Sequence, residues 1–564
     1  MPAPPTGRSS TIETPSAGRR ATAGALLRTL RPLLPTQLLH QALYRLRGPA
    51  RVPAEVSAPG LVGLSSAADA LAPSPEGRRV DGGVALLHTP PHEPREGGWT
   101  PAGRDALWSY TLHYHGWIST CPPEQARDDL LDWIARHDAG VGWEPYPTSM
   151  RALHWIGWLA RGVAAPGHPA SDPALRERLL ASLAAQLRHL EAHVERHLLG
   201  NHLWTNLAAL ASAGLALDGP LARHLRRTAV PAFAAAVADQ LGADGCHLER
   251  TPTYHCLLAE QLGGVVGLGA RHRVARTTRV ITRLEEAHAR MLAALPAFTH
   301  ADGDVALWGD SQRGAPVPPR ALVPSLPRGH ADAPDTGFYR RRWGPWTVLW
   351  NLGLVGMAHQ VGHLHGDALA LEVDLEDERV LVDAGVGTYS RGRERAYARA
   401  TRAHNTVTVG ACDQHELWAS HRIGGRCRVE DVVAKGDTLE ARALGFRASA
   451  WHRRTIRREG DHLVVRDALE PLPGRPLPPA TARLFLPATC TITGRGDERT
   501  VTTPAGRRFL VRADPPLRLG DVEPGWRAIN DPAPRRCLLA PVPARGLEWR
   551  LLPLRAHVDA SASR

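Results

Sequence analysis

The chain has 564 residues, of which 43% are hydrophobic and 22% are charged, and its net charge is +12 with a pI near 9.9. A single ordinary core ends at roughly 250 residues, so two large or three smaller domains are expected. The composition is that of a globular protein and excludes a chain that is disordered throughout. The seven cysteines are odd in number and include no C-x-x-C pair, which argues against a disulfide framework and against a zinc finger.

Residues 1–100 are predicted to be a disordered or amphipathic N-terminal region with a linker. Residues 1–24 and about 50–100 are rich in Pro, Gly, Ser and Ala, and neither stretch is expected to hold chemistry. Between them, GALLRTLRPLLPTQLLHQALYRLRG predicts an amphipathic helix, which is more often a packing or interface element than a membrane anchor. No apolar run approaches the ~20 residues of a spanning helix, and no signal peptide is recognisable. A cytoplasmic location is the default expectation, with a periplasmic or secreted one left open.

Residues 101–325 are predicted to form an all-α domain. From about 105 to 300, apolar residues recur every three or four positions in seven or so segments, such as RDDLLDWIARH and SMRALHWIGWLARGV. Gly, Pro, Asn or Asp separate the segments. From about residue 337 the period changes to two, as in ALALEVDLEDERVLVDAG and WHRRTIRREGDHLVVRDAL. Residues 335–560 are therefore predicted to form an antiparallel all-β domain, and a Rossmann or TIM arrangement is excluded.

The stretch HLHGDALALEVDLEDERVLVDAG, residues 363–385, suggests a metal or catalytic site. If it begins as a strand, His363, His365 and Asp367 share one face. The E-D-E turn would then return Asp383 to the side of His365, and His404 stands at the entrance to a later strand. Two imidazoles and a carboxylate suit Zn²⁺. The alternative is an accidental group among 28 histidines, and a histidine outside the metal site, such as His363, would be free for acid–base work.

Two polar groups stand out in the helical part. Asn201 and His202 precede an apolar helix, where Asn is also a common N-cap residue. DGCHLERTPTYH places several titratable and aromatic groups between two helices, where a plain connector would not need them. These are Asp244, His247, Glu249, Arg250, Tyr254 and His255.

Aromatic residues at loop-to-helix junctions are candidates for sugar binding, because aromatic faces stack on pyranose rings and arginine forks hold carboxylates. The candidates in LHYHGWI and WEPYPTSMR are Tyr114, His115, Trp117, Trp143, Tyr146 and Arg151. Many of the 16 tryptophans are nevertheless expected in the core. No dinucleotide, Walker A, serine-hydrolase or H-E-x-x-H motif is present. The net charge permits an anionic partner, such as an acidic polysaccharide or a membrane surface, and leaves a general surface charge without a dedicated groove equally open. The basic residues are spread evenly and no nucleic-acid-binding motif is present, so nucleic acid is not an expected partner.

Seven motifs, in order between residues 105 and 430, resemble the heparinase II/III-like polysaccharide lyases, a family that includes alginate and oligoalginate lyases. They are YTLHYHGWI, WEPYPTSMR, GNHLWTNLAAL, DGCHLERTPTYH, HLHGDALALEV, VLVDAG and RAHNTVTV. The resemblance implies an α+β multidomain chain, with an N-terminal incomplete (α/α) toroid followed by a C-terminal antiparallel β-sandwich. It places the substrate cleft between the two domains.

The resemblance also implies β-elimination at a uronic acid, with a 4,5-unsaturated product. Asn201 and His202 would contact the substrate carboxylate. Tyr254 would protonate the leaving oxygen and, for one C5 configuration, also act as the base. His363 would be the partner acid or base on the opposite face. A nearby cation such as Arg250 would help Tyr254 to ionise. A structural Zn²⁺ would be held by His365, Asp383 and His404.

The remaining assignments are less specific. The predicted substrate-binding residues are Arg250, Glu249, Tyr146, Trp143, Tyr114, His115 and Tyr389. A second catalytic tyrosine would be Tyr389 or Tyr397. The missing signal peptide suits family members that act beside exopolysaccharide synthesis. Two rival readings are a non-catalytic glycan-binding or assembly protein on the same fold, and a hydrolase, which would need a suitably placed carboxylate pair. The glycan itself and the oligomeric state do not follow from the sequence.

Overall fold

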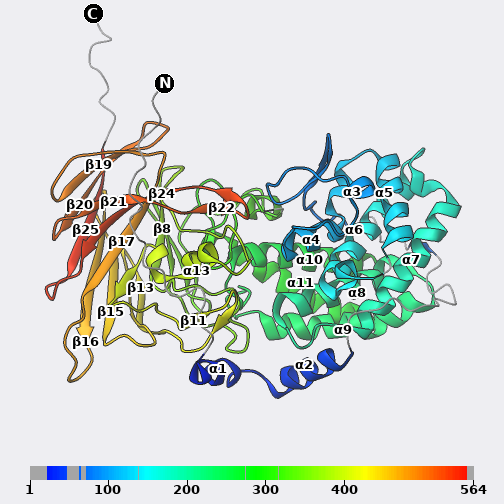
Figure 1. Cartoon of the computed structure of the whole chain (residues 1–564), viewed down its shortest axis with the longest axis horizontal. Coiled ribbons are helices and arrows are strands. Elements are labelled where there is room, and N and C mark those ends of the chain that lie inside the picture. Colours follow the sequence, from blue (N-terminus) through cyan, green and yellow to red (C-terminus); the bar gives the residue numbers. More distant parts are fainter. Residues whose placement is uncertain are drawn as a thin grey trace, which may run out of the picture.

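A computed structural model describes residues 22–47, 63–64, 71–137, 139–272, 275–315 and 317–554. A helical domain and a β-rich domain lie next to each other along the long axis of the molecule (Figure 1). Helices therefore precede antiparallel sheets along the chain, which confirms the predicted α+β multidomain class. Residues 1–21, predicted to be disordered, and part of the predicted linker, residues 48–62 and 65–70, fall outside the described residues.

The helical domain is built from α4 to α11, and five of these helices begin at a proline. Proline suits the first helical position, because its missing N–H would have no partner there and its φ is already helical. The helices are α4 Ala106–Tyr114, α5 Pro123–Arg136, α6 Pro145–Ala164, α7 Pro173–Ala192, α8 Gly200–Ala216, α9 Pro220–Gln240, α10 Pro252–Arg271 and α11 Ala275–Ala294. Short 3-10 turns lie between some of them, η2 Gly116–Thr120, η3 Val141–Trp143, η4 Pro169–Ser171 and η5 Leu295–Phe298.

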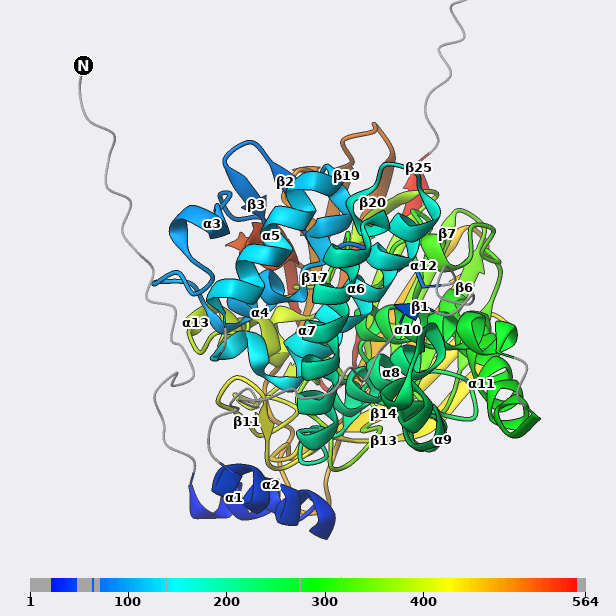
Figure 2. The same ribbon diagram turned by 90° about the vertical axis from the view of Figure 1, so that its right-hand side faces the viewer.

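Helix α8 is the central helix of this domain. It packs against α6, α9 and α10, and all of its residues from 203 to 216 are buried. Figure 2 shows the other helices grouped around it. Most tryptophans of the helical part lie in the same core, namely Trp99, Trp108, Trp117, Trp133, Trp143, Trp155, Trp158 and Trp204. The surplus of tryptophan in the sequence is thus largely a packing feature.

Residues 71–100, which the composition suggests are a linker, pack on the helical domain. They form β2 Arg78–Val80, β3 Gly83–Ala85 and the short helix α3 Pro94–Gly97. Arg79 donates to the buried carboxylate of Asp129 on α5 at 3.1 Å, which attaches the segment to the helices. A second two-stranded sheet joins β1 Gly63–Leu64 to β4 Leu217–Asp218.

The β domain contains three larger antiparallel sheets that enclose one hydrophobic core. The five-stranded sheet has β5 Ala331–Ala333, β6 Phe338–Trp343, β7 Trp346–Asn351, β8 Ala370–Leu375 and β9 Glu378–Leu381 in that order. The eight-stranded sheet follows the order β13 Arg428–Lys435, β14 Thr438–Leu444, β15 Ala450–Glu459, β16 His462–Pro471, β25 Leu547–Leu554, β20 Arg508–Asp514, β19 Glu498–Thr502 and β18 Thr491–Thr493. The four-stranded sheet follows β10 Val407–Val409, β17 Ala480–Pro487, β24 Arg535–Pro541 and β21 Arg518–Glu523.

Smaller elements complete the β domain. Alternate residues of β14 and β15 are buried in the core, as the period of two in the sequence predicts. The two-stranded pairs are β11 Leu417–Trp418 with β12 Arg422–Ile423, and β22 Trp526–Ala528 with β23 Asp531–Pro532. The remaining helical pieces are α12 Pro319–Leu322, α13 Arg393–Arg399 and η6 Thr401–Ala403.

The predicted amphipathic helix near the N-terminus is two helices, α1 Ala23–Leu30 and α2 Pro35–Arg47. Proline at positions 32 and 35 interrupts the helical hydrogen bonding and makes Pro35 the first residue of α2. The pair lies along one side of the molecule, with α1 beneath the β domain and α2 extending toward the helical domain (Figure 1). No helix in the described ranges is long and apolar enough to cross a membrane.

Candidate active site

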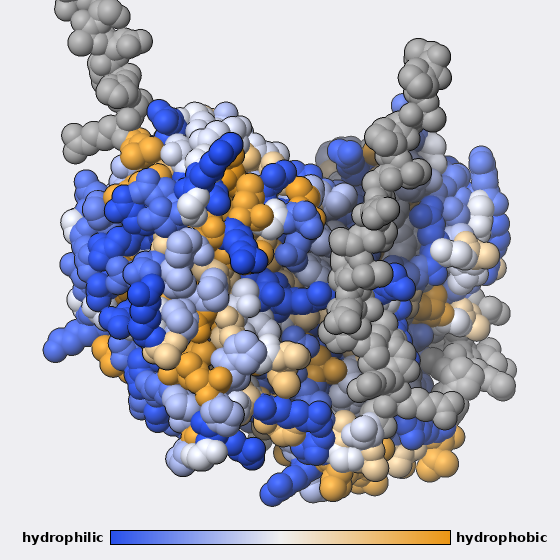
Figure 3. Space-filling view, turned by 60° about the vertical axis from the view of Figure 1, so that its left-hand side comes forward, coloured by the Kyte–Doolittle hydropathy of each residue, from blue (hydrophilic) through white to orange (hydrophobic). Residues whose placement is uncertain are grey.

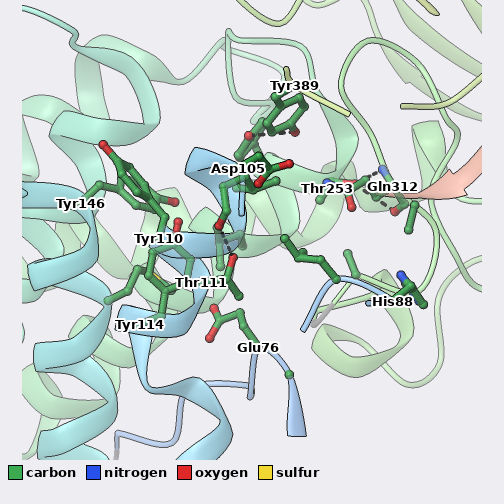
Figure 4. Close-up of a pocket in the computed structure, with 18 of the residues that line it drawn as sticks. Glu76, His88, Asp105, Tyr110, Thr111, Tyr114, Tyr146, Thr253, Gln312 and Tyr389 are labelled. Atoms are coloured by element: carbon green, nitrogen blue, oxygen red, sulfur yellow. Dashed lines mark hydrogen bonds between the residues drawn. The ribbon is translucent and has the colours of Figure 1, made fainter. Parts of the chain in front are cut away.

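A pocket of about 970 Å³ is lined by residues of both domains. The helical domain contributes residues of α4, α6, α8 and α10, and the β domain contributes residues 363, 389, 390, 421 and 528. Residues 75–89, from the segment before α3, complete one wall. Figure 4 shows Tyr110, Tyr114 and Tyr146 together on one side of this pocket and Tyr389, Thr253 and Gln312 on the other.

Tyr254 and His363 face each other in the pocket. Their ring centroids are 4.5 Å apart, and the Tyr254 hydroxyl lies 3.1 Å from that of Tyr389. Burial, with further contributions from Tyr389 and Asp310, raises the pKa of Tyr254 well above its ordinary value. The hydroxyl is therefore protonated at neutral pH and able to donate a proton.

The His363 ring is oriented by a buried carboxylate. Nδ1 of His363 lies 2.7 Å from Oδ2 of Asp310, so Nδ1 carries the hydrogen and Nε2 carries the lone pair. Nε2 lies 3.4 Å from the amide nitrogen of Asn201. Burial alone would raise the pKa of Asp310, but Arg395, which donates to both of its oxygens, and the two histidines beside it hold the pKa well below its usual range.

Asn201 and His202 lie in the first turn of α8, where carboxylates hold both. The Glu249 carboxylate accepts from the Asn201 backbone N–H at 2.9 Å and from its side-chain amide at 2.8 Å. Burial alone would lower the pKa of His202, but Glu195, whose Oε1 is 3.1 Å from Nδ1, raises it. The start of α8 therefore presents an amide and an imidazole that favours its protonated form to the pocket.

The beginning of α8 needs glycine at position 200. Leu199 and Gly200 both have positive φ, 59° and 53°, which turns the chain sharply into the helix. A Cβ at residue 200 would lie 1.8 Å from Oε1 of Glu249. Only glycine lets this carboxylate approach the helix start closely enough to hold Asn201.

The pocket brings together seven of the predicted site residues and leaves out four. Lining it are Tyr114, Tyr146, Asn201, His202, Tyr254, His363 and Tyr389. Of the two candidates for a second tyrosine, Tyr389 lies at the site, whereas Tyr397 donates to Glu523 at 2.6 Å elsewhere in the β domain. The four predicted substrate contacts outside the lining are Trp143, His115, Glu249 and Arg250, and all four are buried.

The buried positions have structural explanations. The Trp143 indole donates to the His137 carbonyl, and the His115 ring accepts from the Trp155 indole, so both belong to the helical core. Arg250 donates to the carbonyls of Thr336 and Leu354 and to the side chain of Asn351. Its guanidinium is engaged there, so the structure does not support the prediction that it contacts substrate or helps Tyr254 to ionise.

The strand prediction for residues 363–367 is wrong, because β8 begins only at Ala370. His363 and His365 stand on the loop before it, and Asp310 receives a hydrogen bond from each of them, at 2.7 and 2.8 Å. The loop, rather than a shared strand face, sends one histidine toward the pocket and the other toward the interior. His404 ends η6 just before β10, as expected.

In the described part of the chain, one group of three side chains has ligand atoms close enough together to hold a metal ion, and it is not the predicted set. Asp310, His363 and His421 have ligand atoms within 4.8 Å of one another, but the guanidinium of Arg395 already binds both Asp310 oxygens. The predicted set is His365, Asp383 and His404, all fully buried. Nδ1 of His404 lies 2.9 Å from Asp383, and the rings of His365 and His404 are 5.5 Å apart.

The predicted metal set also contains two buried ring nitrogens without a partner in the described part of the chain, Nδ1 of His365 and Nε2 of His404. Buried polar atoms are rarely left unpaired, and each such atom costs roughly 1–3 kcal/mol. Imidazole nitrogens are ligands that zinc accepts, but Asp383 contacts the other ring nitrogen of His404, Nδ1, and not the unpaired Nε2.

Comparisons with known proteins agree with this arrangement. The family model "Heparinase II/III N-terminus" matches residues 104–314, and "Heparinase II/III-like, C-terminal" matches residues 325–547. The chain belongs to the heparinase II/III-like family. The family is one of polysaccharide lyases, so the predicted resemblance and enzyme class are confirmed.

Solved heparinase structures share the whole fold of this heparinase II/III-like lyase. A heparinase III aligns with a TM-score of 0.65 and 14% identity over 95% of this chain and 94% of that one. A second heparinase III gives 0.60 and 15% over 96% and 95%. A mutant heparan sulfate lyase from Pedobacter heparinus gives 0.57 and 16% over 92% and 88%. At these identities the likeness concerns the fold, toroid followed by sandwich. None of the curated proteins matches the sequence.

Several residues that line the lyase's pocket, or that lie behind its lining, were not predicted from the sequence. Asp310 and Arg395 orient His363 from beneath, His421 lies beside it, and Glu76 and His88 line the wall formed by the segment assumed to be a linker. In the sequence, Asp310 is one of three aspartates in the loop after the last long helix, with Asp302 and Asp304, and nothing local distinguishes it. Its partner stands 53 residues away, so spacing alone could not reveal the pair.

Proposed function

We propose that this lyase cleaves a uronic-acid-containing anionic polysaccharide by β-elimination, leaving a 4,5-unsaturated sugar. The observation that supports the proposal is the pairing of Tyr254 with His363 in one pocket, with Asn201 beside Nε2 of His363. A hydroxyl and an imidazole then stand within reach of one substrate from different elements. This is the arrangement that proton removal at one carbon and proton donation to a neighbouring oxygen require.

Removal of the weakly acidic C5 proton requires that the negative charge of the uronate be offset. The amide of Asn201 and the imidazole of His202, whose pKa Glu195 raises, stand together at the start of α8. Donors aimed at the carboxylate stabilise the enolate-like anion that forms as the proton leaves. Asn201 and His202 are thus assigned to bind this carboxylate.

The elimination then needs one base and one acid. Nε2 of His363, whose lone pair is left open by the Nδ1–H bond to Asp310, accepts the C5 proton. The electron pair of the C5–H bond forms the C4=C5 double bond, the C4–O bond breaks, and the Tyr254 hydroxyl gives its proton to the departing oxygen. The raised pKa of Tyr254 keeps its hydroxyl protonated at neutral pH, the state from which it can give a proton.

The charges that line the pocket favour a uronate polymer with little sulfate. The lining contains two arginines, Arg78 and Arg313, and two carboxylates, Glu76 and Asp105. Arg313 is also paired with Asp302 at 2.7 Å. Lys435 is the only lysine of the chain and lies in β13, outside the lining. A densely sulfated chain would find few guanidinium partners for its sulfates.

A structural zinc ion held by His365, Asp383 and His404 is part of the proposal. It is supported by the two unpaired ring nitrogens of this set. Bound there, zinc would supply rigidity to the loop that carries His363, because Asp310 contacts both histidines of that loop. Metal analysis of wild type, His404→Ala and His421→Ala tests the assignment. Zinc should be lost only from His404→Ala, and loss only from His421→Ala would move the metal to the group around Asp310.

The activity is tested on glucuronan, alginate, unsulfated heparosan and heparin, by the ultraviolet absorbance of the unsaturated product. Tyr254→Phe should lower turnover by about 10²–10⁴-fold, the usual contribution of a positioned acid. Tyr397→Phe is the matched control, because Tyr397 is a tyrosine outside the pocket. Its turnover should equal that of the wild type.

The outcomes separate the alternatives. Product from the unsulfated uronate polymers in preference to heparin supports the full proposal. Binding of these polymers without any product would favour a non-catalytic glycan-binding protein. New reducing ends without ultraviolet absorbance would favour a hydrolase. A link to exopolysaccharide metabolism stays a prediction from the family resemblance.

A further inference from the structure

Helix α1 binds the rest of the protein through a polar stripe. The Arg28 guanidinium donates to the Glu416 carboxylate at 2.8 and 2.6 Å, and the Trp418 indole donates to the hydroxyl of Thr29 at 3.0 Å. The other side of the helix carries Leu26, Leu27 and Leu30, which are exposed by 44%, 68% and 42%. An ordinary packing helix has the reverse arrangement, with leucines inside and arginines outside.

Helix α2 repeats this inverted pattern. Gln37 is 4% exposed, and the ring of Tyr44 stacks on His197 of the helical domain with centroids 4.4 Å apart. These two positions are seven residues apart and lie on one face of the helix. The leucines of α2 are outward, with Leu38, Leu39, Leu43 and Leu46 exposed by 48%, 59%, 38% and 82%.

No other part of the described ranges has as many exposed large hydrophobic side chains as α1 and α2 with the turn between them. Nine of the fourteen exposed large hydrophobic side chains in those ranges lie between residues 26 and 46. In Figure 3 orange apolar atoms gather along the lower edge of the molecule, at the level where Figure 1 places α1 and α2. Contiguous apolar surface of this kind on a soluble domain marks an interaction site.

The segment that carries these leucines has only positive charges of its own. Between Glu13 and Glu55 the sequence has seven arginines and no acidic residue. Arg31 and Arg45, at the end of α1 and within α2, are exposed. A second copy of the chain, itself at +12, would bring like charge to this face. The leucines and arginines of α1 and α2 are instead complementary to a partner with an apolar interior and an anionic surface.

We propose that α1 and α2 seat the protein on an anionic phospholipid surface. The two helices would lie in the plane of the interface, with the leucines among the acyl chains and the arginines at the headgroups. At 8 and 13 residues they lie on the membrane and do not cross it. The polar stripes of both helices would stay on the protein, so binding requires no rearrangement of the fold.

Flotation of the full chain with vesicles tests the proposal without reference to lyase activity. The vesicles are phosphatidylcholine alone and phosphatidylcholine mixed with phosphatidylglycerol. The test variant carries Leu27→Gln, Leu39→Gln and Leu46→Gln, which change only exposed side chains. The matched control carries three equally conservative exposed changes elsewhere, Val163→Gln, Val432→Gln and Val522→Gln.

Wild type and the control should float with the anionic vesicles, while the leucine variant binds them at least about tenfold more weakly. Added salt should weaken wild-type binding, because the attraction is partly between exposed charges. Equal binding by wild type and the leucine variant would overturn the proposal, as would the absence of wild-type binding to anionic vesicles. In the latter case, a wild type that sediments as a dimer beside a monomeric leucine variant would show that a second copy covers the leucines.

Discussion

Glu249 is the residue whose replacement tests the geometry of the site most directly. Its carboxylate is 2% exposed and accepts three hydrogen bonds, two from Asn201 and one from Gln360 at 3.2 Å. Burial alone would raise the pKa of Glu249, but His363, His247 and the Asn201 donors outweigh it and lower the pKa, so the group is ionised. Glu249→Gln keeps the shape and exchanges one accepting oxygen for an amide donor.

The size of the effect follows from these contacts. In either orientation of the new amide, its NH₂ group faces an N–H of Asn201, and a buried donor left without an acceptor costs about 1–3 kcal/mol. If Asn201 relieves the conflict by turning its own amide, its oxygen faces Nε2 of His363 and its donor is lost to the substrate carboxylate. At 1.4 kcal/mol per factor of ten, kcat/KM should fall by about 5- to 150-fold.

The assay is initial-rate formation of unsaturated product on the best uronate polymer. Glu260→Gln is the matched control, since Glu260 is a carboxylate of α10 that contacts Ser74 outside the pocket. It should keep kcat/KM within about twofold of the wild type, as changes without substrate contact usually do. A Glu249→Gln protein with an unchanged circular dichroism spectrum and wild-type kcat/KM would refute the role given to Glu249 and, with it, the carboxylate-binding role of Asn201.

Three further predictions concern the same region. Gly200→Ala should be inactive or poorly folded because its Cβ meets Glu249. Gly103→Ala, where φ is also positive (81°) but the space around the Cβ is open, should lose only about 1 kcal/mol of unfolding free energy. Tyr389→Phe removes a hydroxyl that contacts the Tyr254 hydroxyl and donates to the Asp310 carbonyl, both neutral hydrogen bonds, and should lower kcat/KM by about 2- to 10-fold. A loss as large as that of Tyr254→Phe would make Tyr389 the acid. Burial raises the pKa of Glu260 to about 7, above its unfolded value. The contribution of this carboxyl to stability is therefore present in acid and is lost as the pH rises through 7. The free energy of unfolding of Glu260→Gln, minus that of the wild type, should be larger at pH 8 than at pH 5 by up to about 3 kcal/mol, as measured by denaturant unfolding.

Each of these outcomes has a counterpart that would contradict it. If the two glycine variants have the same activity and the same free energy of unfolding, the close approach of residue 200 to Glu249 is not important for the site. A stability difference between Glu260→Gln and wild type that does not change with pH would show that the Glu260 carboxyl titrates normally. A Tyr389→Phe protein with the full wild-type rate would show that the Tyr389 hydroxyl does not contribute to activity.

The order of the domains could be predicted from the sequence because it depends on local periodicity. The change from a three-to-four-residue repeat to a two-residue repeat near residue 337 coincides with the start of the long strands at β6. The meeting of Asn201, Tyr254 and His363 could not be derived in this way, since His363 is 162 residues from Asn201. Only the family resemblance indicated it, because spacing alone left helix capping as the better explanation for Asn201.

The predictions that failed concern burial and loop geometry. Trp143 and His115 stand at loop-to-helix junctions, as sugar-binding aromatics do, but the packing of α4, α5 and α6 encloses both. Alternation placed His363 and His365 on one strand face, whereas the strand starts later. Asp310 was missed because a carboxylate that serves two histidines and an arginine has no local signature. Which side chains a core encloses is decided by tertiary contacts and not by neighbours in sequence.

The site exists only where two separate folding units touch. Asn201 and Tyr254 belong to helices, His363 and Tyr389 to the sandwich, and Asp310 to the segment that joins them. A hinge opening of about 1 Å would separate the proton donor from the proton acceptor and could cost roughly 10²-fold in rate while each domain stays folded. Inactivation by heat or mild denaturant should therefore precede the loss of secondary structure. A glycan chain long enough to bind both domains would hold them in the active arrangement.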